Sequence, residues 1–148
     1  MRTVWRALPV VAVLTVALMA CQAVRNADAD PVEFTLGKEF NLGAGQEAVS
    51  GGDDLRVRFS DVLEDSRCPT EVECFWTGQA RIAVLIEPAG RPAATADFNT
   101  NPAPGQIAQT VRVDDYTVEL KALDPYPRTP DEPISFEDYR ATLLVQRQ

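Results

Sequence analysis

The sequence contains no histidine. This absence removes the commonest general base and the commonest metal ligand at neutral pH. A Ser-His or Cys-His nucleophile pair is excluded, and so is a cupredoxin-type copper site, which needs two imidazoles. The chain also lacks a G-x-S-x-G motif, a P-loop and a Gly-rich dinucleotide fingerprint. We therefore expect a protein that is not an enzyme and that has no catalytic residues, cofactor or metal.

Carboxylates are the one plentiful chemical group, with 22 Asp and Glu residues. They could serve a hydrolase as an acid/base pair, but the sequence singles out no such pair. Adjacent acids recur in predicted turns, at Asp53-Asp54, Asp114-Asp115, Asp131-Glu132 and Glu137-Asp138. None has the D-x-[DN]-x-[DN]-G spacing of a calcium loop, and Asp is also common in turns for conformational reasons. Turn chemistry is the favoured interpretation, and calcium binding stays an alternative.

Basic residues are scarce, with 14 Lys and Arg and a net charge of −8. Nucleic-acid binding relies on clustered Lys and Arg, so we expect no nucleic-acid partner. An acidic surface favours solubility and mild repulsion from anionic membranes.

A long hydrophobic run is missing as well. Arg2 and Arg6 precede an apolar segment of 14 residues, Ala7 to Ala20, whereas spanning a bilayer takes about 20. This pattern predicts a signal peptide at residues 1–20. It ends Leu18-Met19-Ala20-Cys21, which resembles the bacterial lipobox. The resemblance implies cleavage before Cys21 and lipidation of Cys21; the alternative is an ordinary signal peptide with an incidental cysteine.

Three segments follow from this interpretation. Residues 1–20 are removed, which leaves 12 basic residues against 22 acids. Residues 21–31 carry the lipid on Cys21 and form a flexible tether to the membrane. Residues 32–148 form one domain. We expect the protein to be exported and anchored in the bacterial cell envelope, with the domain on the extracytoplasmic side.

Alternation of apolar and polar residues dominates the domain. It predicts strands at 34–42 (with a bend at Gly37-Lys38), 46–50, 55–60, 80–87, 93–99, 107–113, 116–123 and 139–146. The pair 107–113 and 116–123 predicts a hairpin around Asp114-Asp115, in which Val113 faces Tyr116 and Ile107 faces Ala122. Ser135 to Asp138 favours a short helical turn. We predict an antiparallel β-sandwich of seven to eight strands, immunoglobulin-like in size; a small β-barrel is the alternative.

Two of the three cysteines lie in one short stretch, Cys68 to Cys74. In an exported protein such a pair is expected to form a disulfide. The alternative is redox catalysis. Against it, the spacing is not C-x-x-C, and the acidic Glu71 and Glu73 would not stabilise a thiolate. A structural disulfide is the favoured interpretation.

Two aromatic residues, Phe75 and Trp76, directly follow this stretch. For Trp76 we favour a place in the core at the end of the sandwich, and the alternative is a contact surface together with Phe75. Arg67 is expected to pair with a neighbouring carboxylate. The loop's exposed face, chiefly Arg67, Pro69 to Glu73 and Phe75, is the first candidate contact surface. Tyr126, in the proline-rich loop 124–133, is a second candidate.

The same stretch carries a resemblance to a protein group. Glu64-Asp65-Ser66-Arg67-Cys68-Pro69, followed by Cys74, Trp76 and Gly78, resembles a motif of uncharacterised bacterial lipoproteins and secreted β proteins. The resemblance implies export and a single β domain, and it carries no activity. We therefore expect a binding or envelope-structural module with a protein or envelope ligand. The alternative is an exported protease inhibitor that presents loops from a β-sandwich, which rests on analogy of fold.

Overall fold

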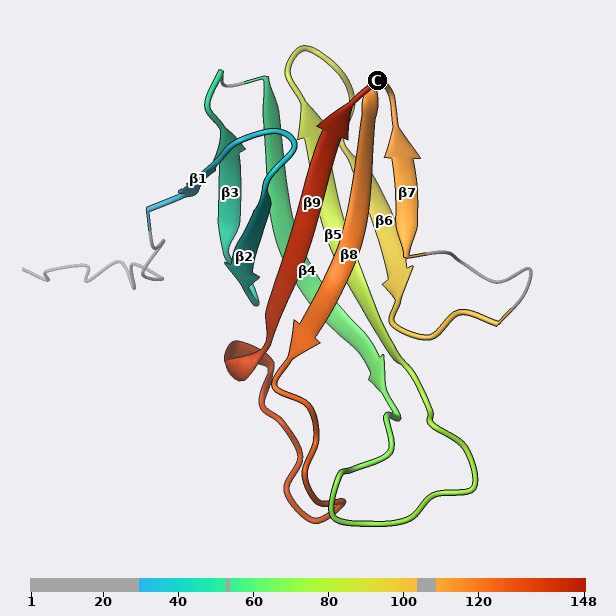
Figure 1. Ribbon diagram of the computed structural model, residues 1–148. Coiled ribbons are helices and arrows are strands. Elements are labelled where there is room, and N and C mark those ends of the chain that lie inside the picture. Colours follow the sequence, from blue (N-terminus) through green and yellow to red (C-terminus); the bar gives the residue numbers. More distant parts are fainter. Residues whose placement is uncertain (1–29, 53, 104–108) are drawn as a thin grey trace, which may run out of the picture.

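The computed structural model describes residues 30–52, 54–103 and 109–148. This part of the chain forms nine strands and one 3₁₀ helix (Figure 1). The strands are β1 (Val32–Phe34), β2 (Glu39–Gly43), β3 (Glu47–Ser50), β4 (Leu55–Asp65), β5 (Ala80–Pro88), β6 (Ala94–Asn99), β7 (Thr110–Val113), β8 (Tyr116–Asp124) and β9 (Arg140–Arg147). The helix η1 (Phe136–Asp138) stands where the short helical turn was predicted. The predicted all-β fold is confirmed.

Two sheets pack face to face. One has the strand order β1-β3-β4-β5-β6 and the other the order β2-β9-β8-β7. The sheets do not close into a barrel, so the sandwich is the observed architecture. All pairings are antiparallel except that of β1 with β3, which is parallel. The predicted sandwich is therefore antiparallel apart from this short pair at one edge. The chain turns at Gly37, whose φ is +78°, and passes from one sheet to the other between β1 and β2.

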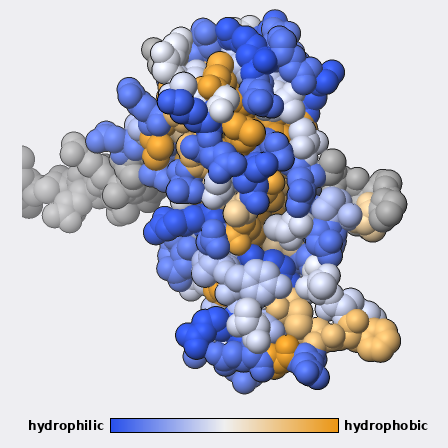
Figure 2. All heavy atoms as spheres, in the orientation of Figure 1, coloured by the Kyte–Doolittle hydropathy of each residue, from blue (hydrophilic) through white to orange (hydrophobic). Residues whose placement is uncertain are grey.

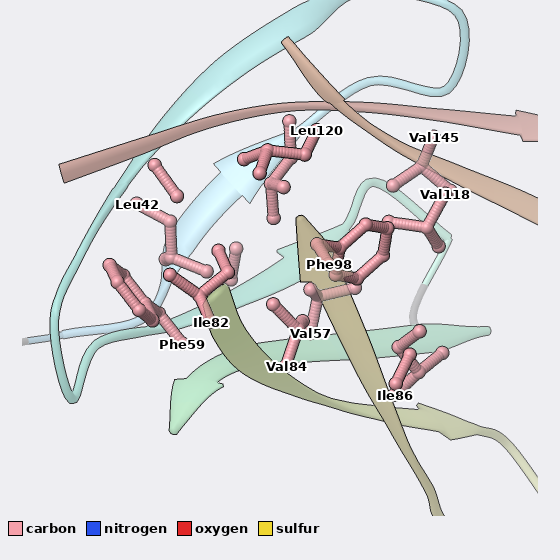
Figure 3. Packing of buried hydrophobic residues seen from close by; sticks show 14 of the residues in the cluster. Leu42, Val57, Phe59, Ile82, Val84, Ile86, Phe98, Val118, Leu120 and Val145 are labelled. Atoms are coloured by element: carbon pink, nitrogen blue, oxygen red, sulfur yellow. The ribbon is translucent and has the colours of Figure 1, made fainter. Parts of the chain in front are cut away.

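The core lies between the sheets and follows the alternation of the sequence. Val57 and Phe59 of β4 and Ile82, Val84 and Ile86 of β5 are fully buried. Figure 3 shows them in one core with residues of the opposite sheet, with Phe59 and Ile82 beside Leu42. Because successive side chains of a strand point to opposite faces, these patterns fixed which face of each strand is inside.

The hairpin of β7 and β8 has the predicted register. Val113 pairs with Tyr116 and Val111 with Val118, around the two-residue loop Asp114-Asp115. The predicted pairing of Ile107 with Ala122 falls outside the described residues. In the four-stranded sheet β7 is an edge strand, and β8 pairs on its other side with β9.

Strand β4 is longer than predicted. It continues for 11 residues to Asp65, with register shifts against β5 after Phe59 and after Val62. The extension carries the chain to the end of the sandwich where the long β4–β5 and β8–β9 loops lie (Figure 1). Within the described residues no helix is long and apolar enough to cross a membrane. The signal-peptide and tether predictions fall outside the described residues, apart from Asp30 and Pro31.

Candidate functional site

Two loops that are distant in sequence meet at one end of the sandwich. They are residues 66–79, between β4 and β5, and residues 125–139, between β8 and β9; together we call them the loop end. The backbone N–H of Thr70 donates to the carbonyl of Pro127 at 3.1 Å. The N–H of Glu71 donates to the carbonyl of Arg128 at 2.9 Å. The two loops therefore support each other along their length.

The base of the first loop continues the β4–β5 hairpin. The N–H of Ser66 donates to the Gln79 carbonyl at 2.7 Å, and the N–H of Cys68 donates to the Thr77 carbonyl at 2.8 Å. Gly78 closes this base with a φ of +66°, and a Cβ there would stand 1.8 Å from the Ser66 carbonyl oxygen. Only glycine fits a backbone approach of this kind.

Arg67 is the residue that ties the two loops together. Its Nε and Nη2 donate to the two carboxylate oxygens of Asp65 at 2.8 and 2.6 Å. Its Nη1 donates to the Leu123 carbonyl at 2.7 Å, and Nη2 also reaches the Pro125 carbonyl at 2.9 Å. Arg67 is 7% exposed. The expectation that Arg67 belongs to an exposed contact face was wrong, because its guanidinium binds backbone carbonyls of the neighbouring strand and loop.

Two tyrosines contact this ion pair. The ring of Tyr126 lies under the guanidinium of Arg67, 5.0 Å from its central carbon. The hydroxyl of Tyr139 donates to the carboxylate of Asp65 at 2.8 Å. Tyr126, a predicted contact residue, is 46% exposed. Its ring thus packs against Arg67 and is also accessible to solvent. We call Asp65, Arg67, Tyr126 and Tyr139 the Arg67 cluster.

The cluster shifts the acidity of two of its members. Burial by itself raises the pKa of the Asp65 carboxyl, but the hydrogen bonds from Arg67 and Tyr139 and the charge of Arg67 together hold this pKa below its ordinary value. Burial, the hydrogen bond to Asp65 and the negative charge of Asp65 raise the pKa of Tyr139 to about 12. Asp65 is therefore ionised and Tyr139 neutral at neutral pH, which is the pairing that the hydrogen bonds require.

The tip of the first loop is closed by its two cysteines. Cys68 and Cys74 lie at disulfide-bonding distance, with Cα atoms 5.9 Å apart. Pro69, between them, is partly buried, and its carbonyl accepts a hydrogen bond from the Val72 N–H at 3.3 Å. The ring contains six residue steps, so it constrains the tip and links no distant strands.

Phe75 and Trp76 project from this tip into solvent. Phe75 is 96% exposed and Trp76 is 75% exposed. Their rings contact each other edge to face, with centroids 5.5 Å apart. The prediction that Trp76 fills the core was wrong, because its side chain lies in the loop before β5 and is exposed to solvent. Figure 2 shows apolar atoms projecting to one side at this end of the molecule, with hydrophilic atoms mostly on the other side.

Carboxylates are frequent in both loops of the loop end. Glu71 pairs with Arg128 of the second loop at 2.9 Å. Glu73, Asp131 and Glu132 are exposed, and they form no ion pair with any of the residues that the structure describes. The loop end thus combines an exposed aromatic pair with exposed carboxylates, and we call Glu73, Asp131 and Glu132 its acidic rim.

A groove of about 440 Å³ opens on the flank of the loop end. Its walls include Arg67 and Tyr126, the turn at Gly78, Asn101 and the last residues of β8. Asn101 donates to Thr77 Oγ1 at 2.9 Å and to the Gly78 carbonyl at 3.1 Å. The side chains of Arg67 and Asn101, which line the groove, already form hydrogen bonds within the loop end. The groove therefore contributes a concave surface next to the tip.

The acidic turns at the opposite end of the sandwich are paired with arginines. Arg91 contacts Asp114 at 2.8 Å and Asp115 at 3.4 Å, and Arg147 contacts Asp54 at 3.3 Å. The described residues contain no group of three or more Cys, Asp or Glu side chains arranged to hold a metal ion. Cys21, the predicted lipidation site, falls outside those residues.

The sequence indicated part of this arrangement. The pairing of Cys68 with Cys74 and of Arg67 with a neighbouring carboxylate is visible from spacing alone. The contribution of Tyr139 was missed, because it lies 74 residues from its partner Asp65 and reads as the start of the last strand. Gly78 was noticed only as part of a motif. A glycine directly before a core strand was the one signal of a close backbone approach.

Comparison with known proteins gives no match for this chain, whether to protein families, to curated proteins or to solved structures. Inference about function consequently starts from the geometry of the loop end.

Proposed function

We propose that this protein is an exported, lipid-anchored, non-catalytic module that binds another protein of the cell envelope through its loop end. The observation that carries the proposal is the exposure of Phe75 and Trp76 on a fixed tip. Asp65, Arg67 and Gly78 of the same stretch each have a partner or a steric role within the fold. The rings of Phe75 and Trp76 contact each other and otherwise face solvent.

The tip is suited to binding because it is ordered before a partner arrives. Ordering a loop on association costs about 0.5–1.5 kcal/mol per immobilised side chain. Here the disulfide, the Arg67 cluster and the hydrogen bonds between the loops already supply much of that order. Trp and other aromatic residues are also the residue types that most often dominate binding energy at protein interfaces.

Photo-cross-linking in cells tests the proposed contact. A benzoylphenylalanine introduced at Phe75 or at Trp76 should give a discrete protein adduct on irradiation. The matched control is the same residue at Arg112, which is exposed on β7 at a distance from the loops. Absence of an adduct from both tip positions, or an identical adduct pattern from position 112, would contradict the proposal.

The anchor is tested separately at Cys21. The tether 21–31 would reach roughly 35 Å when extended, at about 3.3 Å per residue. Cys21→Ser should move the protein from the detergent phase to the aqueous phase of a detergent partition, whereas the wild type stays with the detergent. If the variant and the wild type partition alike, the proposed lipidation of Cys21 is wrong.

A protease inhibitor is the second candidate function. The observation that favours it is the joining of the loops into one wedge by hydrogen bonds from Thr70 and Glu71 to the second loop. Inhibition of an exported protease by the intact protein would support it. Cleavage of either loop as an ordinary substrate, without inhibition, would count against it.

A further inference from the structure

We infer that the partner surface is positively charged around an apolar socket that receives Phe75 and Trp76. This inference rests on the proposed function and names the chemistry of the partner.

The charge of the loop end is strongly one-sided. Its residues comprise six acids and two arginines, a net charge of −4. Arg67 is buried and its guanidinium is held by Asp65, Leu123 and Pro125. Arg128 is paired with Glu71 at 2.9 Å. Both cations are therefore engaged, and the surface offers a partner chiefly the unpaired carboxylates of Glu73, Asp131 and Glu132.

The aromatic centre determines the shape of the partner. Phe75 and Trp76 stand out from the tip with 96% and 75% exposure, so the surface is convex at that point. A convex aromatic pair loses its contact with water only inside a concave apolar pocket. Carboxylates at the rim then require cations around the mouth of that pocket, because like charges across an interface oppose association.

The same charges argue against a membrane as the occupant. Exposed aromatic side chains do insert at bilayer interfaces, but stable binding there is strengthened by Lys and Arg next to anionic lipid. The carboxylates around this tip would be repelled by such a surface. A basic protein surface satisfies both the aromatic centre and the acidic rim.

Peptide binding measures this preference directly. The probes are fluorescently labelled peptides of alternating Lys-Leu, Lys-Ser and Glu-Leu, with anisotropy as the readout, and vesicles of phosphatidylglycerol. We expect the full chain to bind the Lys-Leu peptide at least about tenfold more tightly than the other two. Binding should weaken as salt rises from about 0.01 M to about 1 M, because the Debye length falls from about 30 Å to about 3 Å.

Two double variants separate the local charge from the net charge. Glu73→Gln/Glu132→Gln removes two rim carboxylates and should weaken Lys-Leu binding about fivefold or more. Glu33→Gln/Glu39→Gln removes the same charge from β1 and β2, outside both loops, and should leave binding nearly unchanged. Trp76→Ser should weaken binding at least as much as the rim variant.

Three results would overturn the inference. They are equal affinity for the Lys-Leu and Glu-Leu peptides, equal effects of the two double variants, and binding to phosphatidylglycerol vesicles that depends on Trp76. If one of these results is obtained while position 75 or 76 still gives a protein adduct, the inference about the partner's charge fails and the proposed function stands. Absence of the adduct would remove the proposed function itself.

Discussion

Arg67 is the residue on which the geometry of the loop end depends most. It joins β4, the end of β8 and the β8–β9 loop, through contacts with Asp65, Leu123 and Pro125. A buried ion pair stabilises a fold only when desolvation is offset by good geometry and full hydrogen bonding. Within the described residues no buried side-chain polar atom lacks a partner, so this condition is met here.

Removing the guanidinium should leave the carboxylate of Asp65 without its main partner. Arg67→Met is therefore expected to lower the free energy of unfolding by about 3–5 kcal/mol. The matched control is Arg128→Met, which breaks the exposed pair with Glu71 and should cost at most about 1 kcal/mol. Urea unfolding of both variants and the wild type gives the comparison. Equal, small losses would show that Arg67 is not a structural centre.

The low pKa of Asp65 makes this stabilisation dependent on pH. Because the folded-state pKa lies below the ordinary value of 3.8, the ionised form stabilises the fold above pH 3.8. The contribution is lost as the pH falls through the lower, folded-state pKa. Asp65→Asn should therefore be less stable than the wild type at pH 7, and the difference should shrink in strong acid. A difference that is constant from pH 7 to acid would contradict the assignment.

Trp76 shows the limit of reading single residues from sequence. A tryptophan a few residues before a core strand is compatible with burial and with exposure. In the structure Trp76 lies in sequence between the disulfide and the hydrogen-bonded loop base, and its side chain is exposed. The same limit applies to Arg67, whose backbone partners lie 56 and 58 residues away.

Among the strands and loops, prediction succeeded where one face of an element is buried. The register of β7 with β8 followed from two apolar faces that had to agree. The extension of β4 through residues 61–65 was missed, because this part lies beyond the core and has no hydrophobic period. The parallel pairing of β1 was missed for a related reason, since alternation is the same in either strand direction.

The base of the first loop depends on the close approach of two backbone segments. Gly78→Ala places a Cβ 1.8 Å from the Ser66 carbonyl oxygen in a region of positive φ. We expect the base to open, with loss of about 1–3 kcal/mol of stability or more. The control is Gly90→Ala, which has a φ of +71° but no atom within 4 Å of the added Cβ. Comparable losses in urea unfolding would show that positive φ, and not the steric contact, sets the cost.

The complete domain has two different ends. Ion pairs of Arg91 and Arg147 fasten the turns at one end, and these pairs are formed within the fold. The other end carries the disulfide, the Arg67 cluster and the exposed aromatic pair. Sequence reasoning identified the fold class and the cysteine pair of this end. It did not identify which side chains of that stretch support the loop and which are exposed.

The role of Trp76 is decided most directly by urea unfolding of Trp76→Ser beside Phe59→Ala. Trp76 is 75% exposed, so its substitution should change the free energy of unfolding by at most about 0.5 kcal/mol. Phe59 is fully buried, so its truncation should cost about 3–5 kcal/mol. A loss of about 3–5 kcal/mol for Trp76→Ser as well would place Trp76 in the core and contradict a binding surface at the tip.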